Sequence, residues 1–318
     1  MTIPVPHRHK SKEGRAVRIN RTVISCVAMA LALAVGGCGT SSESSVSKPT
    51  SPVDVGVPVP TQWQDQGLIR VGIACDYPPF GYTDIQGKNA GYDADVARSL
   101  AAYAFGDDTK VTFTCVTPQN RIPYLETNKI DLIISTLGYT KERDETIDYS
   151  TPYFTSGAKL LVPADSQVTG WNDIHGKPVT TKTGTTSSTF LTNCYPDSEQ
   201  LLLDSTSDAV KALKAGRAVA FAEDSTLLLG LTLNDDGLKV VGEDKAETPW
   251  GIGIRQGDEA SKKWVDAALA DMQRKDTLYD IFNGAVKDQE AAQAFAANMP
   301  RPDQKVAYTD KDTLADCS

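Results

Sequence analysis

The chain has 318 residues, which is long enough for about two domains that each bury a core of their own. It carries 32 Lys and Arg residues and 41 Asp and Glu residues. Residues 1–37 contain six of the basic residues and one of the acidic ones. Residues 38–318 therefore contain 26 basic and 40 acidic residues, a net charge of −14. So acidic a body repels nucleic acid and anionic lipid, which argues against a nucleic-acid-binding protein.

The N-terminal segment has the features of an export signal. Basic residues up to Arg21 precede the apolar run Val23–Val35, which is too short to span a membrane easily. The run ends in Val35-Gly-Gly-Cys38, which looks like a bacterial lipobox. We therefore expect residues 1–37 to be a lipoprotein signal peptide and Cys38 to be the lipidated first residue. A plain secretory signal with an incidental cysteine is the alternative.

Residues 38–65 follow this signal and contain many Ser, Pro and Val without any periodicity. Such a composition predicts a disordered tether.

The body of the chain alternates short strands with helices. Strands are predicted at Ile69–Ala74, Val111–Val116, Ile130–Ile134, Lys159–Val162, Pro178–Thr181, Ala218–Ala222 and Leu238–Val241. Helices are predicted at Tyr92–Phe105, Lys141–Glu145, Ser207–Ala215, Ser225–Leu231 and Ser261–Arg274. This alternation predicts an α/β protein with parallel sheets and right-handed crossovers.

The chain is expected to cross twice between two lobes. Residues 66–157 and 251–300 are assigned to lobe 1, residues 158–250 to lobe 2, and residues 301–318 to a C-terminal tail. Two crossings make a hinge, and a hinge between two lobes can close around a ligand.

The stretch Asn128–Phe154 contains the first candidate ligand residue. The buried strand Ile130–Ile134 breaks into small and hydroxyl residues, and Thr140 is placed to cap the helix Lys141–Glu145. Arg143 then falls beyond the carboxyl end of the strand, where open α/β folds bind ligands. A guanidinium above hydroxyls and backbone amides suits a small carboxylate. The alternative is that Arg143 is one more solvated charge.

Four motifs occur together and in order: Tyr77-Pro-Pro-Phe80, Gly91–Val96, Asn120–Leu125 and Asp131–Arg143. With them the chain, from about Leu68 to Gly284, resembles the family of extracytoplasmic solute-binding proteins (family 3) that serve ABC importers of polar amino acids. The resemblance implies a two-lobed periplasmic-binding-protein-like fold of type II, a free amino acid ligand and permease subunits as partners. It also implies a monomer without a cofactor. The lipobox-like sequence at Cys38 predicts that this protein is lipid-anchored to the outer face of the bacterial cell membrane.

An amino acid ligand needs partners for its carboxylate and its ammonium. The carboxylate is assigned to Arg143 and to the helix N-terminus at Thr185-Thr186, where exposed amides and the helix dipole attract anions. Ordinary capping is the alternative role for both threonines. The resemblance assigns the ammonium to Asp224, whose alternative role is to cap the next helix. The carbonyl of Gly138 and the hydroxyl of Thr140 are expected to share these contacts.

The ligand side chain is expected to meet a further group of residues. Tyr77 should lie over its aliphatic part with Phe80 behind, although both could instead belong to the core. Lys182 and Gln119 would favour an acidic or amide side chain, whereas Glu223 would favour a cation. The balance favours glutamate, glutamine or a close relative.

Four cysteines remain after Cys38, namely Cys75, Cys115, Cys194 and Cys317, and an exported protein can form disulfides. Cys75 and Cys115 end predicted strands that would be neighbours and parallel, so we predict Cys75–Cys115 and, from the remaining pair, Cys194–Cys317. Free buried thiols are the alternative. No Cys/His spacing indicates a metal site.

An enzyme on the same fold, such as a dehydratase, is the main rival to a binding protein. Beyond the signal the sole histidine is His175, so the sequence contains no Ser/His/Asp triad, although Glu223 could act as a general acid. A sensor lobe that signals to a membrane partner is the third possibility. We predict a binding protein rather than an enzyme.

Overall fold

The computed structural model describes residues 47–233, 235–286, 289–309 and 311–318, all of them in one compact unit, Glu43–Ser318. The predicted signal peptide and Cys38 lie outside these described residues. Within them, no helix is long and apolar enough to span a bilayer.

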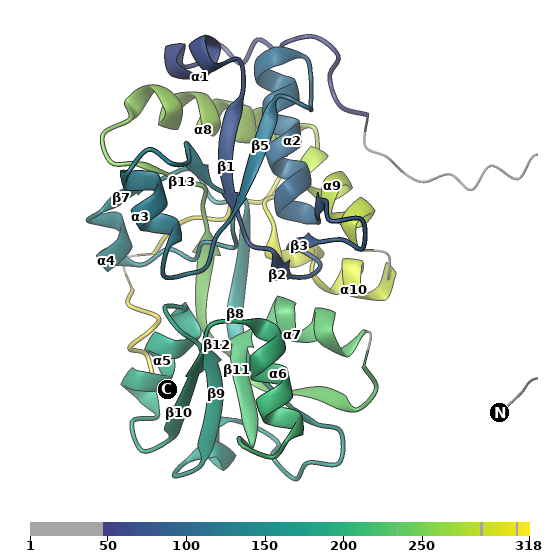
Figure 1. Ribbon diagram of the computed structural model, residues 1–318, viewed down its shortest axis with the longest axis vertical. Helices are drawn as coiled ribbons and strands as arrows, with labels where there is room; N and C mark the ends of the chain where they lie inside the picture. Colours follow the sequence, from purple (N-terminus) through teal and green to yellow (C-terminus); the bar gives the residue numbers. More distant parts are fainter. Residues whose placement is uncertain (1–46, 234, 287–288, 310) are drawn as a thin grey trace, which may run out of the picture. The chain divides into compact units, whose positions relative to one another are not determined.

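Lobe 1 is built on a five-stranded sheet with the strand order β5-β1-β6-β13-β7 (Figure 1). Its strands are β1 (Ile69–Ile73), β5 (Val111–Cys115), β6 (Leu132–Ile133), β7 (Ile147–Tyr149) and β13 (Gly253–Arg255). β1 pairs in parallel with β5 and β6, whereas β13 runs antiparallel to β6 and β7. A small second sheet beside it consists of β2 (Asp76–Tyr77), β3 (Gly81–Thr83) and β4 (Asn89–Ala90).

Helices surround this sheet: α1 (Thr61–Gln66), α2 (Tyr92–Phe105), α3 (Arg121–Glu126), α4 (Lys141–Asp144), α8 (Glu259–Arg274), α9 (Thr277–Ala285), α10 (Gln289–Ala294) and the 3₁₀ turn η2 (Ala296–Asn298). α2 matches its predicted range. Its first turn carries Asp93 and Asp95, which suit the positive end of a helix, and it ends at Gly106 with a φ of 69°, a left-handed conformation that favours glycine.

Lobe 2 has a sheet of its own, in the order β10-β9-β11-β8-β12. The strands are β8 (Phe154–Pro163), β9 (Pro178–Lys182), β10 (Glu199–Leu203), β11 (Ala220–Asp224) and β12 (Leu238–Trp250). The helices are the 3₁₀ turn η1 (Trp171–Ile174), α5 (Thr186–Cys194), α6 (Thr206–Lys214) and α7 (Ser225–Thr232). β9 pairs in parallel with β10 and β11, but β8 is antiparallel to both β11 and β12.

The hinge is the antiparallel pair β8 and β12, which runs from the level of the first sheet into the second (Figure 1). At its lobe 1 end Phe154 pairs with Trp250, and their rings stack at 4.8 Å. The expectation of purely parallel sheets is therefore wrong, and both sheets are mixed. A chain that enters lobe 2 along one strand and returns along its neighbour must make an antiparallel pair.

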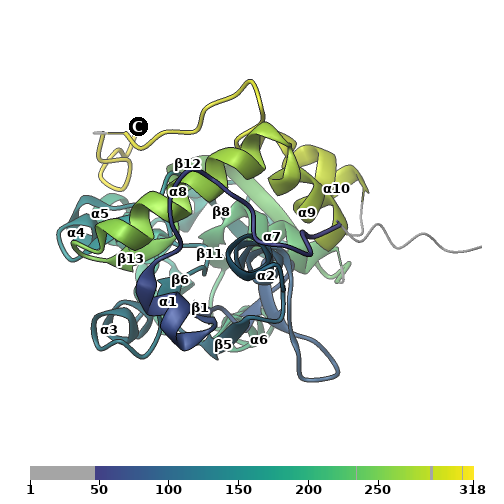
Figure 2. The ribbon, with the colours of Figure 1, turned by 90° about the horizontal axis from the view of Figure 1, so that it is seen from above.

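The predicted disordered tether also needs a correction for residues 47–65. The amide of Val53 donates to the carbonyl of Tyr103 at 2.9 Å, and four alternate valines from Val53 to Val59 pack on the lobe 1 core. Trp63 of α1 is fully buried, with its ring edge-on to Trp264 at 5.5 Å. In Figure 2 this purple segment lies over the face of lobe 1 that carries α2 and α8. The segment is attached to lobe 1 by apolar residues at every second position, a pattern that the overall composition of the segment did not indicate.

Both predicted disulfides are confirmed. Cys75–Cys115 joins the ends of β1 and β5, which lie in register at Ile73 and Cys115. Cys194–Cys317 joins the last residue of α5 to the C-terminal tail.

Candidate ligand-binding site

A small cavity of about 30 Å³ lies between the lobes where β1, β6, β9 and β11 end. Its walls include eight of the ten predicted ligand residues: Tyr77, Gly138, Arg143, Lys182, Thr185, Thr186, Glu223 and Asp224. Since one water needs at least about 10–15 Å³ of such space, an amino acid can enter only if the lobes separate or the side chains move. The lobes contact each other across this cavity through several polar side chains.

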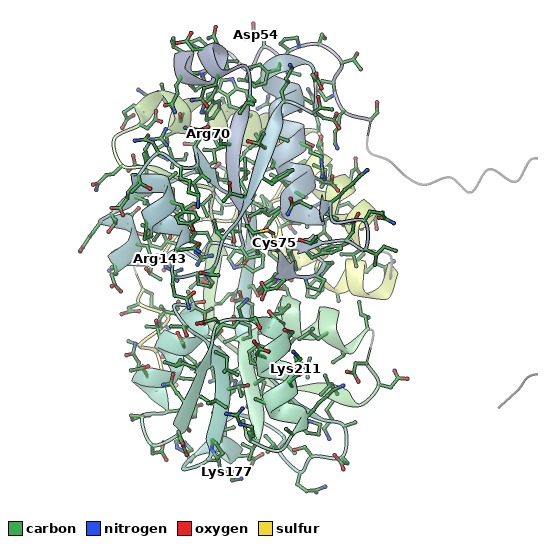
Figure 3. All side chains as sticks on the ribbon, in the orientation of Figure 1. Asp54, Arg70, Cys75, Arg143, Lys177 and Lys211 are labelled. Atoms are coloured by element: carbon green, nitrogen blue, oxygen red, sulfur yellow. A yellow bond between two sulfur atoms is a disulfide. The ribbon has the colours of Figure 1, made fainter. Side chains whose placement is uncertain are left out.

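Arg143 reaches from lobe 1 to lobe 2. Its Nη1 donates to the carbonyl of Gly138 at 2.7 Å, and its Nη2 donates to the carbonyl of Gly184, in lobe 2, at 2.9 Å. Figure 3 labels Arg143 at the level where the lobes meet. The guanidinium is thus held at the cavity by backbone oxygens, and it forms no salt bridge with a carboxylate among the described residues. Arg143 therefore differs from an ordinary solvated surface charge.

Thr140 and Gly138 have other bonds than expected. The hydroxyl of Thr140 accepts from the amide of Arg143 at 3.1 Å, so Thr140 caps α4 as predicted, but it lines a neighbouring cavity rather than this one. The carbonyl of Gly138 accepts from Arg143 and from the hydroxyl of Tyr149 at 3.1 Å. Both lone pairs of this carbonyl are in use, so it could meet a ligand ammonium only after a donor moves.

The N-terminus of α5 forms the lobe 2 wall. Thr185 is its N-cap: its Oγ1 accepts from the amide of Ser188 at 3.2 Å and donates to the carbonyl of Lys182 at 2.9 Å. Thr186 is the first residue of the helix and lines the cavity with Thr185. Thr185 therefore caps α5 and also lines the cavity. The positive end of a nine-residue helix faces the cavity, which favours an anion there.

Two adjacent carboxyls end β11 at the cavity. Asp224 occupies the N-cap position of α7 but makes no side-chain capping bond; its Oδ2 instead accepts from the hydroxyl of Tyr77, in lobe 1, at 2.9 Å. Glu223 is 1% exposed, its Oε1 accepts from the amide of Asp224 at 3.1 Å, and its Oε2 has no partner among the described residues. Burial raises the pKa of both carboxyls, and the charge of Asp224 raises the pKa of Glu223 further.

Lys182 differs from the prediction because its charge is already paired. Its Nζ lies 3.1 and 3.2 Å from the carboxylate oxygens of Asp76 and 3.2 Å from the hydroxyl of Thr206. Asp76, in lobe 1, also accepts from the amide of Thr206 at the N-terminus of α6, at 2.9 Å. Burial acts to raise the pKa of Asp76, but the charge of Lys182 and these hydrogen bonds outweigh it, so this pKa lies below its usual value. The ammonium of Lys182 is thus paired with a carboxylate of lobe 1 rather than free to pair with an acidic ligand.

Gln119 and Phe80 lie away from the cavity. The amide Nε2 of Gln119 donates to Asp204 of lobe 2 at 3.0 Å in an exposed position, so Gln119 connects the lobes without lining the cavity. Phe80 is fully buried among aromatic rings, with Phe154 and Trp250 each at 5.1 Å, which is the core role considered for it.

Sequence reasoning missed Arg121 and Asp76. Arg121 begins α3, is 4% exposed, and donates from Nη1 to the carbonyl of Ser135 at 2.7 Å, while its Nε has no partner among the described residues. Burial, and then the like charge of Arg143, lower the pKa of Arg121 to about 9. The signal was present, since Arg121 follows the carboxyl end of β5 just as Arg143 follows that of β6.

Comparison with known proteins identifies the family. Bacterial extracellular solute-binding proteins, family 3, match residues 69–286. The glutamine-binding protein of Geobacillus stearothermophilus is 36% identical over 190 residues, which cover 59% of this chain and 72% of that protein. The ABC transporter glutamine-binding protein GlnH of Bacillus subtilis (strain 168) is 30% identical over 230 residues, covering 72% and 84%. The structure of a cysteine-binding protein from Campylobacter jejuni has a TM-score of 0.69 at 29% identity and covers 71% of this chain and 92% of that one.

These relatives are solute-binding proteins and not enzymes, which confirms the prediction of a binding protein. Their two-lobed type II fold is the one described above. The family match covers more than half of the chain, and the chain therefore belongs to the family 3 bacterial extracellular solute-binding proteins.

Proposed function

We propose that this protein binds a polar amino acid between its lobes and delivers it to the permease of an ABC importer. The observation that carries the proposal is the placement of Arg143 on one lobe, with Asp224 and the N-terminus of α5 on the other, around one cavity. Arg143 and the helix N-terminus suit the ligand carboxylate, and Asp224 suits its ammonium. When the lobes close around the ligand, its charged ends take the place of contacts that join the lobes in the structure. The hydrogen bond from Tyr77 to Asp224 is one such contact.

The charges in the cavity favour a glutamate or glutamine type of ligand. Lys182 and Asp76 neutralise each other, and Arg143 and Asp224 are assigned to the ligand backbone. This leaves the buried guanidinium of Arg121 and the carboxyl of Glu223, whose pKa is raised by burial and by the charge of Asp224, which favours the neutral form of this carboxyl. A ligand side chain therefore meets a net positive charge and a neutral carboxyl that can donate a hydrogen bond. Carboxylate or amide side chains fit these groups, and cationic ones do not.

Some of the relatives support the same class. Their names assign glutamine to the Geobacillus and Bacillus proteins and glutamate and aspartate to a Pseudomonas aeruginosa protein 28% identical over 232 residues. An ancestral arginine-binding protein solved with glutamine bound has a TM-score of 0.65 at 31% identity.

The test is thermal melting of the chain from residue 39 onward, unfolded and refolded to remove any bound solute, against each amino acid singly. The chain used for melting keeps residues 47–65, because they pack on lobe 1. A ligand at 100 times its Kd adds about 2.7 kcal/mol to the stability of the folded state, which raises the melting midpoint visibly. A shift with glutamine or glutamate supports the proposal. A shift with arginine or lysine alone would refute the charge argument, and no shift with any amino acid would refute the function.

We also propose that the protein is a lipoprotein anchored at Cys38 in the outer face of the cell membrane. The lipobox-like sequence Val35–Cys38 supports this. In cells fed a clickable palmitate analogue, the wild-type chain should become labelled, and a Cys38→Ser variant should lose the label. Equal labelling of the two would exclude the anchor.

A further inference from the structure

Residues after the family match form an additional connection between the lobes. The match ends at residue 286, and the chain continues through α10 and η2 into the segment Met299–Thr309 and Lys311–Ser318, which we name the strap. In Figures 1 and 2 the yellow strap leaves lobe 1 beside α9, passes the hinge side of the unit near β12, and ends beside α5.

The first half of the strap is fixed to lobe 1. Met299 is fully buried in the lobe 1 core. The guanidinium of Arg301 pairs with Asp276 at 2.6 and 2.8 Å and lies 3.8 Å from the ring centroid of Tyr279. Tyr308 then stacks on Tyr139 at 4.5 Å between ring centroids. These contacts end directly beside the hinge.

The hydroxyl of Tyr308 donates to the carbonyl of Ser150 at 2.5 Å, and its ring also lies against Tyr149 at 5.8 Å. A Cβ added to Gly251, which follows β12, would clash with the Tyr308 hydroxyl. The glycine therefore leaves room for the tyrosine at the point where the chain returns to lobe 1.

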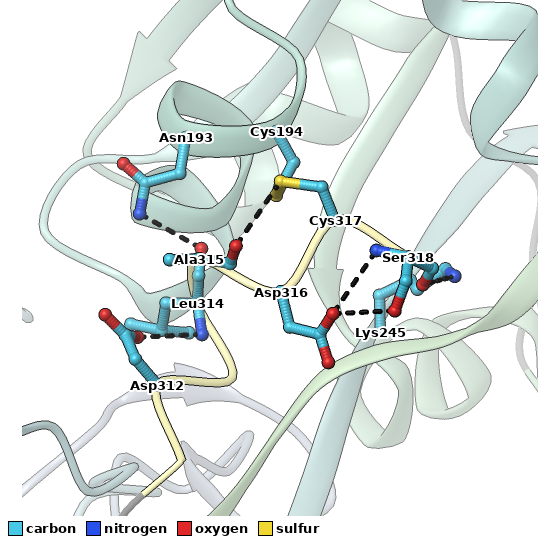
Figure 4. The surroundings of a disulfide bond; sticks show 9 residues. All are labelled: Asn193, Cys194, Lys245, Asp312, Leu314, Ala315, Asp316, Cys317 and Ser318. Carbon is cyan, nitrogen blue, oxygen red and sulfur yellow. Dashed lines mark hydrogen bonds between the residues drawn. A yellow bond between two sulfur atoms is a disulfide. The ribbon is translucent and has the colours of Figure 1, made fainter.

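The second half of the strap is fixed to lobe 2 (Figure 4). Leu314 is 7% exposed within the lobe 2 core, and its carbonyl accepts from Nδ2 of Asn193 at 3.0 Å. Cys317 is bonded covalently to Cys194 of α5, and the carbonyl of Ser318 accepts from Lys245 of β12 at 2.5 Å. Between the two anchors a cavity of about 260 Å³ separates the strap from α4, α5 and β12, so the middle of the strap lies clear of the hinge.

We propose that the strap is a third connection between the lobes, beside β8 and β12, and that it restricts how far and in which direction the lobes move about the hinge. Nine residue steps from Tyr308 to Cys317 reach at most about 30 Å when fully extended. The lobe 1 end is held by the half-buried Tyr308 and, before it, the buried Met299, whereas the lobe 2 end is held by the buried Leu314 and by the disulfide. The two anchors therefore cannot separate beyond that reach while Tyr308 stays attached to lobe 1. Other movements of the lobes bend or twist the same short segment.

The test compares lobe movement with and without the covalent anchor. Spin labels are placed on the exposed residues Thr109 of lobe 1 and Lys177 of lobe 2, and the distance distribution between them is measured by double electron–electron resonance without ligand. In the Cys194→Ser/Cys317→Ser variant we expect a broader distribution than in the wild type. The matched control, Cys75→Ser/Cys115→Ser, removes a disulfide inside lobe 1 and should leave the distribution unchanged.

A second variant releases the other end of the strap. Tyr308→Ala removes the stacking and the bond to Ser150, with the disulfide intact, and should broaden the distribution as well. Distributions equal to the wild type in both variants would overturn the proposal, and so would an equal broadening in the Cys75/Cys115 control. Because the measurement needs no ligand, its result is independent of the proposed function.

Discussion

Replacing Arg143 with alanine is the most direct test of the site. The guanidinium donates to the backbone carbonyls of Gly138 and Gly184 and forms no salt bridge among the described residues, so no carboxylate of the protein loses its partner. The helix α4 is short, and Arg143 contributes to its cap through the backbone amide, which alanine keeps. We therefore expect the fold to remain and ligand binding to weaken.

The size of the expected loss in binding free energy depends on Arg121. Truncating one partner of a buried charge pair costs about 2–5 kcal/mol. Arg121 lines the same cavity, and the charge of Arg143 is one cause of its lowered pKa, so its own charge becomes easier to keep once Arg143 is gone. Because a second cation remains in the same cavity, we expect the loss in the lower part of that range, about 2–3 kcal/mol, or roughly 30- to 150-fold in Kd.

The assay is isothermal titration calorimetry with the amino acid that raises the melting midpoint. Arg143→Lys, which keeps the charge but not the planar fork, should fall between wild type and alanine. With Arg121→Gln as the second mutation, a double-mutant cycle should show coupling, because the two like charges interact across one cavity. Wild-type affinity in Arg143→Ala would refute the site, and strict additivity would refute the role given to Arg121.

Three further predictions concern the remaining charges and disulfides. Burial raises the pKa of Asp224 to about 6, and a bound ammonium favours the ionised carboxylate. The ligand affinity should therefore be full above about pH 6 and fall as the pH drops through that value. Kd values that do not change from about pH 5 to 7.5 would exclude the contact between Asp224 and the ammonium. Asp76→Asn should leave the buried Lys182 without its counter-charge and lower the urea midpoint or the ligand affinity, and a variant equal to wild type in both would show that the ion pair contributes nothing. Cys75→Ser/Cys115→Ser opens a loop of 40 residues, and the entropy that the unfolded chain regains should lower the free energy of unfolding by about 4 kcal/mol. A loss under ~1 kcal/mol would mean that the loop stays closed without the disulfide.

Local patterns predicted most of the elements, and they failed where a residue bonds to a distant part of the chain. α2 was predictable because its apolar face, acidic first turn and terminal glycine agree. The apolar run Ile130–Ile134, by contrast, contributes only Leu132–Ile133 to the sheet. Within it Asp131 is drawn to the guanidinium of Arg70, with Nε donating at 3.0 Å, which periodicity alone cannot indicate.

Site positions were predictable where they depend on the ends of strands and helices, as for Arg143, Asp224 and Thr185. They were not predictable where they depend on the distance between lobes. Lys182 and Gln119 are both polar residues at the expected edge, and both are bonded to the opposite lobe, at Asp76 and Asp204. Such pairs join residues 106 and 85 positions apart, and no short-range pattern encodes them.

The two-residue strand β2 holds two different parts of lobe 2 at once. Asp76 binds Lys182 and the N-terminus of α6, and its neighbour Tyr77 binds Asp224 at the end of β11. Because the two residues are adjacent in one strand, we expect both contacts to break together when the lobes part. Opening is then expected to be a cooperative transition between two populations rather than a gradual widening. A solute that binds one population should change how many molecules are closed and leave the angle of each unchanged.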